Sequence, residues 1–130
     1  MPIYDEAFDP PAPLADVDLR NPDSRLNVRG VSMLIDSGAD LTLVPREAAE
    51  QIRADLTREV FELIGFDGGT SLARAVHLDL VFLDRTYRGN YLVLDRDYGI
   101  LGRDILNQSA LLFDGPRLVW TELRSSDRSS

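Results

Sequence analysis

Apolar and polar residues alternate along most of this chain in short runs, a pattern that predicts β-strands. Residues 14–20 alternate imperfectly and stop at the turn sequence NPDS. Two further apolar runs follow at 25–35 and 41–45, and Gly30 marks a kink or tight turn within the first of them. The first run leads directly to Asp36, so we expect this carboxylate at the C-terminal end of a strand.

One segment has the pattern of a helix instead. PREAAEQIRADL, residues 45–56, places a proline in the first turn and strong helix formers behind it. Ala48, Ile52 and Leu56 fall on one face of that helix. Farther along the chain, residues 105–108 are expected to form only a short helical turn.

Strand patterns return in the second half of the chain. Residues 58–65 and 71–83 are predicted strands joined by the turn GFDGG, and DRTYRG, residues 84–89, is a predicted turn into the strand NYLVLD. Residues 110–123 predict a hairpin whose turn is DGP. The core candidates of the longest strand are Leu72, Val76, Leu78, Leu80 and Phe82. The whole pattern predicts a mostly β domain with one or two short helices.

Length and composition indicate one compact domain. With 130 residues and 44% hydrophobic content, the chain is long enough for a real core but too short for two. We assign residues 14–123 to this domain. Residues 1–13 form an extended, proline-rich N-terminal arm in this interpretation, and residues 124–130 a polar C-terminal tail.

Charge and residue usage exclude several classes of function. The net charge is −8 and basic residues do not cluster, so we expect no nucleic-acid and no membrane partner. The absence of cysteine excludes disulfides, thiolate catalysis and cysteine-bound zinc. No apolar run reaches the ~18 residues of a membrane span, and the N-terminus lacks the pattern of a signal peptide, so a cytoplasmic location is expected.

The carboxylate of Asp36 is the main candidate for chemistry. In the simplest interpretation it accepts backbone N–H groups in a turn, and Gly38 supplies unusual backbone angles. Apolar residues on both sides, however, predict that this loop lies inside the core, where an unpaired carboxylate is costly. A metal is not expected, because the only histidine, His77, lies in a distant strand and the chain has no lysine or cysteine. An arginine and a second carboxylate both remain open as partners.

Three motifs resemble those of the retropepsin-like, single-lobe aspartic proteases. DSGAD at residues 36–40 resembles the catalytic loop of that family, and ILGRDIL at residues 100–106 is similar to its second hallmark, an apolar strand entering a Gly-Arg-Asp turn and a helix. Between them, LIGFDGGT at residues 63–70 resembles the flap, a glycine-rich hairpin that folds over bound substrate. The resemblance spans residues 14–123 and implies a closed or partly open β-barrel with a flap hairpin.

The resemblance also implies a reaction, with Asp36, Ser37 and Gly38 as the catalytic residues. Amide hydrolysis by water needs a base and an acid, and two adjacent carboxylates that share one proton supply both, as in aspartic proteases. The chain contains a single DSG, so the second aspartate must come from another copy. We therefore expect an aspartic endopeptidase that acts as a homodimer on extended peptides and needs no cofactor.

Further residues acquire roles through the same resemblance. Structural support is implied for Gly102, Arg103 and Asp104. Arg103 would form a buried pair with the Asp40 carboxylate, and Asp104 would cap the short helix at 105–108. Substrate contacts are implied for Ala39, Asp40, Gly65, Phe66, Asp67, Gly68 and Gly69.

Two features leave alternatives open. Asp67 stands at the flap tip, where the resemblance implies an apolar residue. Two such charges meeting on a dimer axis would repel, which leaves three alternatives: the flap stays open, it closes through Phe66, or it closes best at acidic pH. A fold also does not fix an activity. The alternatives are a dimeric module of the same fold that binds extended peptides without cutting them, and a plain β-rich interaction domain whose DSG is only a turn.

Overall fold

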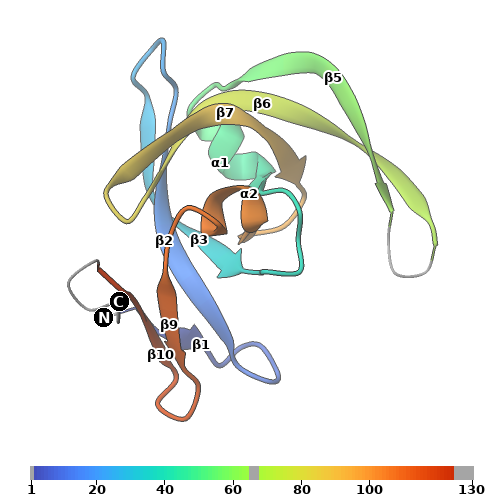
Figure 1. Cartoon of the computed structure of the whole chain (residues 1–130). Coiled ribbons are helices and arrows are strands. Elements are labelled where there is room, and N and C mark those ends of the chain that lie inside the picture. The colour runs from blue at the N-terminus through green and yellow to red at the C-terminus, as the bar shows by residue number, and fades with distance from the viewer. Residues whose placement is uncertain (1, 65–67, 125–130) are drawn as a thin grey trace.

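The computed structural model describes residues 2–64 and 68–124 and confirms a mostly β fold (Figure 1). Two short helices, α1 (Arg46–Gln51) and α2 (Arg103–Leu106), interrupt the strands. The strands are β1 (Tyr4–Asp5), β2 (Ala12–Arg20), β3 (Asn27–Ile35), β4 (Leu43–Pro45), β5 (Asp55–Ile64), β6 (Thr70–Phe82), β7 (Arg85–Leu94), β8 (Gly99–Leu101), β9 (Leu111–Asp114) and β10 (Val119–Glu122). No helix in this part of the chain has the length and apolar character that crossing a membrane requires.

The main sheet closes into a barrel. Its strand order is β1-β2-β3-β8-β4-β7-β6-β5, and β2 pairs a second time with β6, which joins the two sides of the sheet. The sheet mixes antiparallel pairs with the parallel pairs β3–β8 and β4–β7. This topology confirms the β-barrel expected from the sequence, and β5 and β6 continue beyond it as a long hairpin (Figure 1).

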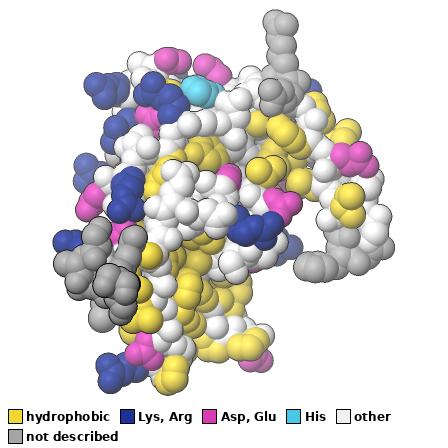
Figure 2. All heavy atoms as spheres, viewed as in Figure 1, with side chains coloured by type: hydrophobic (Ala, Val, Ile, Leu, Met, Phe, Trp, Pro, Cys, Tyr) yellow, Lys and Arg dark blue, Asp and Glu magenta, His cyan; other side chains and the backbone are white. Residues whose placement is uncertain are grey.

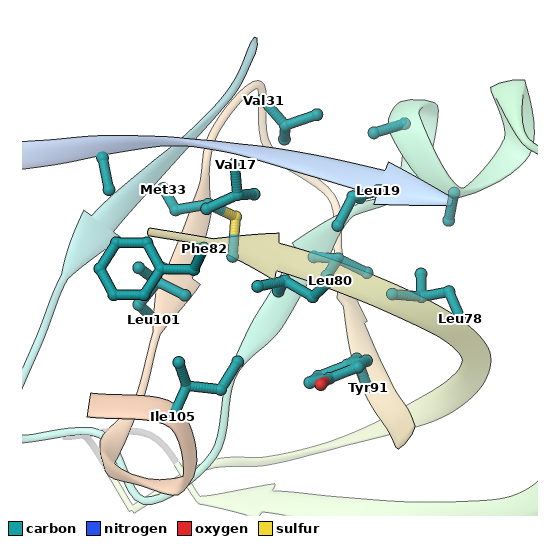
Figure 3. Close-up of a cluster of buried hydrophobic side chains, with 14 of the residues drawn as sticks. Val17, Leu19, Val31, Met33, Leu78, Leu80, Phe82, Tyr91, Leu101 and Ile105 are labelled. Atoms are coloured by element: carbon teal, nitrogen blue, oxygen red, sulfur yellow. The ribbon is translucent and has the colours of Figure 1, made fainter. Parts of the chain in front are cut away.

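Aliphatic side chains from facing strands fill the barrel (Figure 3). Val76, Leu78, Leu80 and Phe82 are buried, as the alternation in their strand predicts. Leu72 is not a core residue, because it is 77% exposed. It lies where β6 has left the barrel and pairs only with β5, so no second layer covers it.

The predicted helix at 45–56 is too long. Helix α1 ends at Gln51, and Leu56 is an exposed residue of β5. The buried side chain of Asn21 donates hydrogen bonds from Nδ2 to the carbonyls of Ile52 and Arg53, both at 3.0 Å. These bonds satisfy carbonyls that a longer helix would use, so the β2–β3 turn helps to end α1.

The predicted turn at 84–89 is also wrong. β6 and β7 pair up to Phe82 and Arg85, so only Leu83 and Asp84 connect them. Both residues have positive φ angles, 51° and 63°. A two-residue connection of this kind matches the right-handed twist of the flanking strands, although leucine is not a residue that signals it.

The hairpin at 110–123 is confirmed and forms a separate two-stranded sheet of β9 and β10. The indole of Trp120 is buried beside Phe82, and its N–H donates to the carbonyl of Leu14 at 2.9 Å. This hydrogen bond attaches the hairpin to β2 and to the barrel core.

Candidate active site

Asp36 lies where β3 ends, at the rim of the barrel. Its backbone N–H donates to the carbonyl of Leu101 in β8 at 3.1 Å, which continues the parallel pairing of β3 and β8. Its carboxylate Oδ1 accepts the N–H of Gly38 at 2.9 Å. A Cβ at Gly38 would lie 3.1 Å from the same oxygen, so a side chain there would crowd the carboxylate. The sequence correctly placed Asp36 at the end of a strand and in a turn.

The loop is more exposed in the single chain than its apolar neighbours predict. Asp36 is half-buried, and Ser37, Gly38 and Asp40 are exposed. The expectation that this loop lies inside the core is therefore wrong for one chain. The strands on either side enter the core, but the loop connects their ends at the rim, where the described part of the chain does not cover it.

Arg103 connects the loop to α2. Its guanidinium donates to the carbonyl of Ser37 at 2.7 Å and pairs with the carboxylate of Asp40, while its backbone N–H donates to the carbonyl of Ala39 at 2.9 Å. The predicted Asp40–Arg103 pair is confirmed. It is not buried, however, because the Arg103 and Asp40 side chains are 43% and 81% exposed.

Asp104 supports the loop from the same helix in a way that the sequence did not predict. Gly102, and not Asp104, is the N-cap residue of α2, which begins at Arg103. The Asp104 carboxylate nevertheless accepts the N–H of Ile105 in the first turn at 3.0 Å, so the expected bonding of Asp104 to the start of the helix is confirmed and its position as the N-cap residue is not. The Asp104 carboxylate also accepts two hydrogen bonds from Thr42, from the hydroxyl at 2.7 Å and from the backbone N–H at 3.1 Å. Thr42 is buried, and its hydroxyl oxygen accepts the N–H of Gly102 at 3.0 Å.

Gly102 and Thr42 thus hold the end of the loop against the start of α2. A Cβ at Gly102 would lie 2.6 Å from the carbonyl carbon and oxygen of Leu41, so only glycine allows this close approach. Thr42 was missed as a site residue. The only sequence signal for it is a single hydroxyl within the apolar run LTLVP.

A hollow of about 470 Å³ separates this loop from the β5–β6 hairpin. Gly38, Ala39 and Asp40 line it on the loop side, so the structure brings three of the expected site residues to one hollow. Its remaining lining residues are Leu41, Leu43, Glu62, Leu63, Ile64 and Leu92. Most of these are aliphatic, which suits apolar side chains of a bound peptide.

The tip of the hairpin is described only in part. Gly65, Phe66 and Asp67 lie outside the described residues, so the expectations for them remain predictions. Gly68 is exposed and has a φ angle of +81°, a backbone conformation that favours glycine. Within the described residues, no group of three or more histidine, aspartate or glutamate side chains is arranged to hold a metal ion.

A closed barrel whose Asp-Ser-Gly loop is bonded to a Gly-Arg-Asp turn is the arrangement of a retropepsin-like aspartic protease. Residues 23–105, more than half of the chain, match the family described as aspartyl protease, and the chain belongs to this family. The fold is similar to that of the EIAV protease complexed with the inhibitor HBY-793. The TM-score is 0.59 at 21% identity, over 75% of this chain and 86% of that chain. A comparison with curated proteins finds no match.

Proposed function

We propose that the protein is an aspartic endopeptidase that acts as a symmetric homodimer. Two Asp36 carboxylates, one from each chain, activate the water molecule that hydrolyses the peptide bond. The observation that carries this proposal is the position of the Asp36 loop. Arg103, Asp104 and Thr42 hold it beside an aliphatic hollow. Each chain has one such loop, so the second carboxylate comes from a second copy.

The reaction follows from the behaviour of two carboxylates held close together. Their mutual repulsion prevents both from ionising, so the pair shares one proton. The ionised member takes a proton from water, which attacks the peptide carbonyl, while the protonated member donates its proton to the carbonyl oxygen. The member that took the water proton then donates it to the leaving nitrogen as the C–N bond breaks, and the other carboxylate takes back a proton from a hydroxyl of the tetrahedral intermediate. The apparent pKa values that govern the rate belong to the pair.

The hollow supports a substrate in extended conformation. A peptide strand lying between the loop and β5 would meet backbone groups of Gly38, Ala39 and Asp40 on one side. Its alternate side chains would contact the aliphatic wall formed by Leu41, Leu43, Leu63 and Leu92. Ser37 would bond across the dimer axis, and residues 65–69 would act as the flap.

The homodimer requirement is tested by mixing chains. Wild-type protein is equilibrated with an equal amount of an Asp36→Asn variant, and cleavage of a mixture of unstructured peptides is followed by mass spectrometry. Random pairing leaves about one quarter of the dimers with two aspartates, so we expect roughly a quarter of the activity of wild-type protein alone at the same total chain concentration. Mixing with Asp97→Asn, a change at an exposed residue outside the hollow, leaves the activity unchanged. A residual activity of one half would contradict the shared site.

A further inference from the structure

Another hollow of the molecule lies between α1 and the strands β5, β6 and β7. Its volume is about 370 Å³. None of its lining residues belongs to the Asp36 loop or to the hollow beside that loop. Ligand sites of proteins have volumes of about 300–1,000 Å³, so a hollow at the lower end of this range suits a small ligand.

The floor of this hollow is aliphatic. It is formed by Ala49 of α1, Ala54 of the following turn, Leu56 of β5, Val76 of β6 and Val93 of β7. Ala49, Val76 and Val93 are buried, whereas Leu56 is 58% exposed although it pairs directly with Val76. An apolar group placed over the floor would cover the side chain of Leu56, which favours binding.

The rim of the hollow carries two opposite charges that do not pair with each other. Glu50 and Arg53 are three residues apart, a spacing at which opposite charges on a helix commonly interact. Helix α1, however, ends at Gln51, and Arg53 has a φ angle of 52°, so the chain has left the helical path before it reaches Arg53. In the described part of the chain neither side chain forms a salt bridge.

This separation of charges differs from the arrangement elsewhere on the surface. Figure 2 shows arginine and acidic side chains lying next to each other on one face of the molecule, as in the Arg117–Asp114 pair. At the rim of the hollow itself, the third charged residue, Arg46, is paired with Asp95. Glu50 and Arg53 therefore remain as a carboxylate and a guanidinium that a ligand can bind.

We propose that this hollow binds a free aliphatic α-amino acid. The ligand carboxylate pairs with Arg53, its ammonium group pairs with Glu50, and its side chain covers the floor at Leu56 and Val76. A zwitterion of this kind satisfies both charges of the rim at once, whereas a ligand with a single charge leaves one of them without a partner. The proposal does not depend on the proposed function, because the hollow shares no lining residue with the one beside the Asp36 loop.

The test uses L-leucine as the probe and follows the amide and methyl NMR signals of the full chain. We expect saturable shifts centred on Ala49, Leu56 and Val93, with a dissociation constant of about 1 mM or lower. Three related compounds each remove one feature of the probe: leucinamide lacks the carboxylate, N-acetylleucine lacks the ammonium group, and glycine lacks the side chain. Each should bind at least about tenfold more weakly than L-leucine.

Two variants assign the charges of the ligand to the rim. Arg53→Gln should weaken L-leucine binding at least about tenfold and hardly change leucinamide binding, because leucinamide has no carboxylate to lose a partner. Glu50→Gln should do the same for L-leucine and hardly change N-acetylleucine binding. Arg25→Gln is the matched control, since Arg25 is also an exposed arginine with a positive φ angle, 68°, but does not line the hollow.

A third variant tests the space itself. Ala54 is half-buried in the hollow, so Ala54→Phe should fill it and abolish L-leucine binding. Urea unfolding verifies that this variant is folded, and the exposed positions of Glu50 and Arg53 keep the test valid if it is not. Binding by Asp36→Asn should equal that of wild type, which separates this site from catalysis.

Several results would overturn the proposal. They are an absence of saturable L-leucine binding, shifts centred outside the hollow, equal binding of glycine, and binding that depends on only one of the two rim charges or on neither. No peptide is cleaved in these measurements, so each of these results leaves the proposed activity standing. A protein that binds L-leucine as expected but cleaves no peptide supports the site and contradicts the activity.

Discussion

At the scale of residues, the position of Asp36 depends on a few polar contacts with the first turn of α2. The pairing of Arg103 with Asp40 was predictable, because a guanidinium and a carboxylate in two matching motifs suit each other. The role of Thr42 was not predictable, since one hydroxyl in an apolar run gives no sign of its partner. The partner of Asp104 is also set by tertiary structure, because the loop and α2 are far apart in sequence.

Arg103 offers a test of how this support affects catalysis. In an Arg103→Gln variant the pair with Asp40 is lost, and the Ser37 carbonyl loses the contact that fixes the loop. The pair is exposed, so we expect the free energy of unfolding to fall by no more than about 1 kcal/mol. Misplacement of the loop should lower kcat/KM by roughly 10²-fold.

Urea unfolding and peptide cleavage measure the two effects of Arg103→Gln separately. Arg46→Gln is the control, because it removes another exposed ion pair, with Asp95, away from the loop. It should change neither quantity appreciably. Unchanged cleavage by Arg103→Gln would show that the guanidinium does not position Asp36.

At the scale of elements, the strands of the barrel were largely predictable and their ends were not. Alternation identified four buried residues of β6, Val76, Leu78, Leu80 and Phe82, because the barrel covers that face of the strand, but it wrongly included Leu72. The helix prediction extended too far, because residues 55 and 56 pair with His77 and Val76 in the β5–β6 ladder. Tertiary pairing outweighs helix propensity there. The Leu83–Asp84 turn was missed because strand twist, rather than residue type, selects it.

The β6–β7 ladder contains a buried carboxylate whose pairing can be tested. Asp79 and Arg88 are directly opposite, and the guanidinium donates two hydrogen bonds to the buried carboxylate at 2.8 and 3.1 Å. The hydrogen bonding by Arg88 lowers the pKa of Asp79, although burial acts in the opposite direction. The pair therefore stabilises the fold at pH values above about 3.9, the pKa of an aspartate carboxyl in the unfolded chain. This stabilisation is lost as the pH falls through the lowered pKa of Asp79 in the folded chain.

An Arg88→Leu variant should lose about 2 kcal/mol of stability at pH 7, because a buried acceptor is left without its donor. The difference from wild type should shrink as the pH falls below about 4, where the carboxyl becomes protonated. Urea unfolding at pH 7, 4 and 3 measures both effects. Arg74→Leu, an exposed change on β6, is the control and should cost less than about 0.5 kcal/mol. An equal loss at every pH would contradict this role.

At the scale of the whole molecule, one chain presents a single Asp-Ser-Gly loop at the rim of a closed barrel. The motifs DSGAD, LIGFDGGT and ILGRDIL, in this order along the chain, predicted the family. The first and last of them lie in contact in the fold. The exposure of Leu112 and Phe113 could not be predicted from sequence. Leu112 and Phe113 belong to an ordinary apolar strand pattern, and only the arrangement of the hairpin, attached through Trp120 and clasped by the N-terminal segment, leaves their edge open.

The central claim is that two chains form one catalytic site, and the stoichiometry of a transition-state mimic tests it most directly. A statine-type peptide carries a hydroxyl that an assembled pair of carboxylates should bind. Isothermal titration at a concentration where the chain sediments as a dimer should give one bound mimic per two chains, and Asp36→Asn should abolish binding. One mimic per chain, or binding that persists in Asp36→Asn, would contradict the shared site.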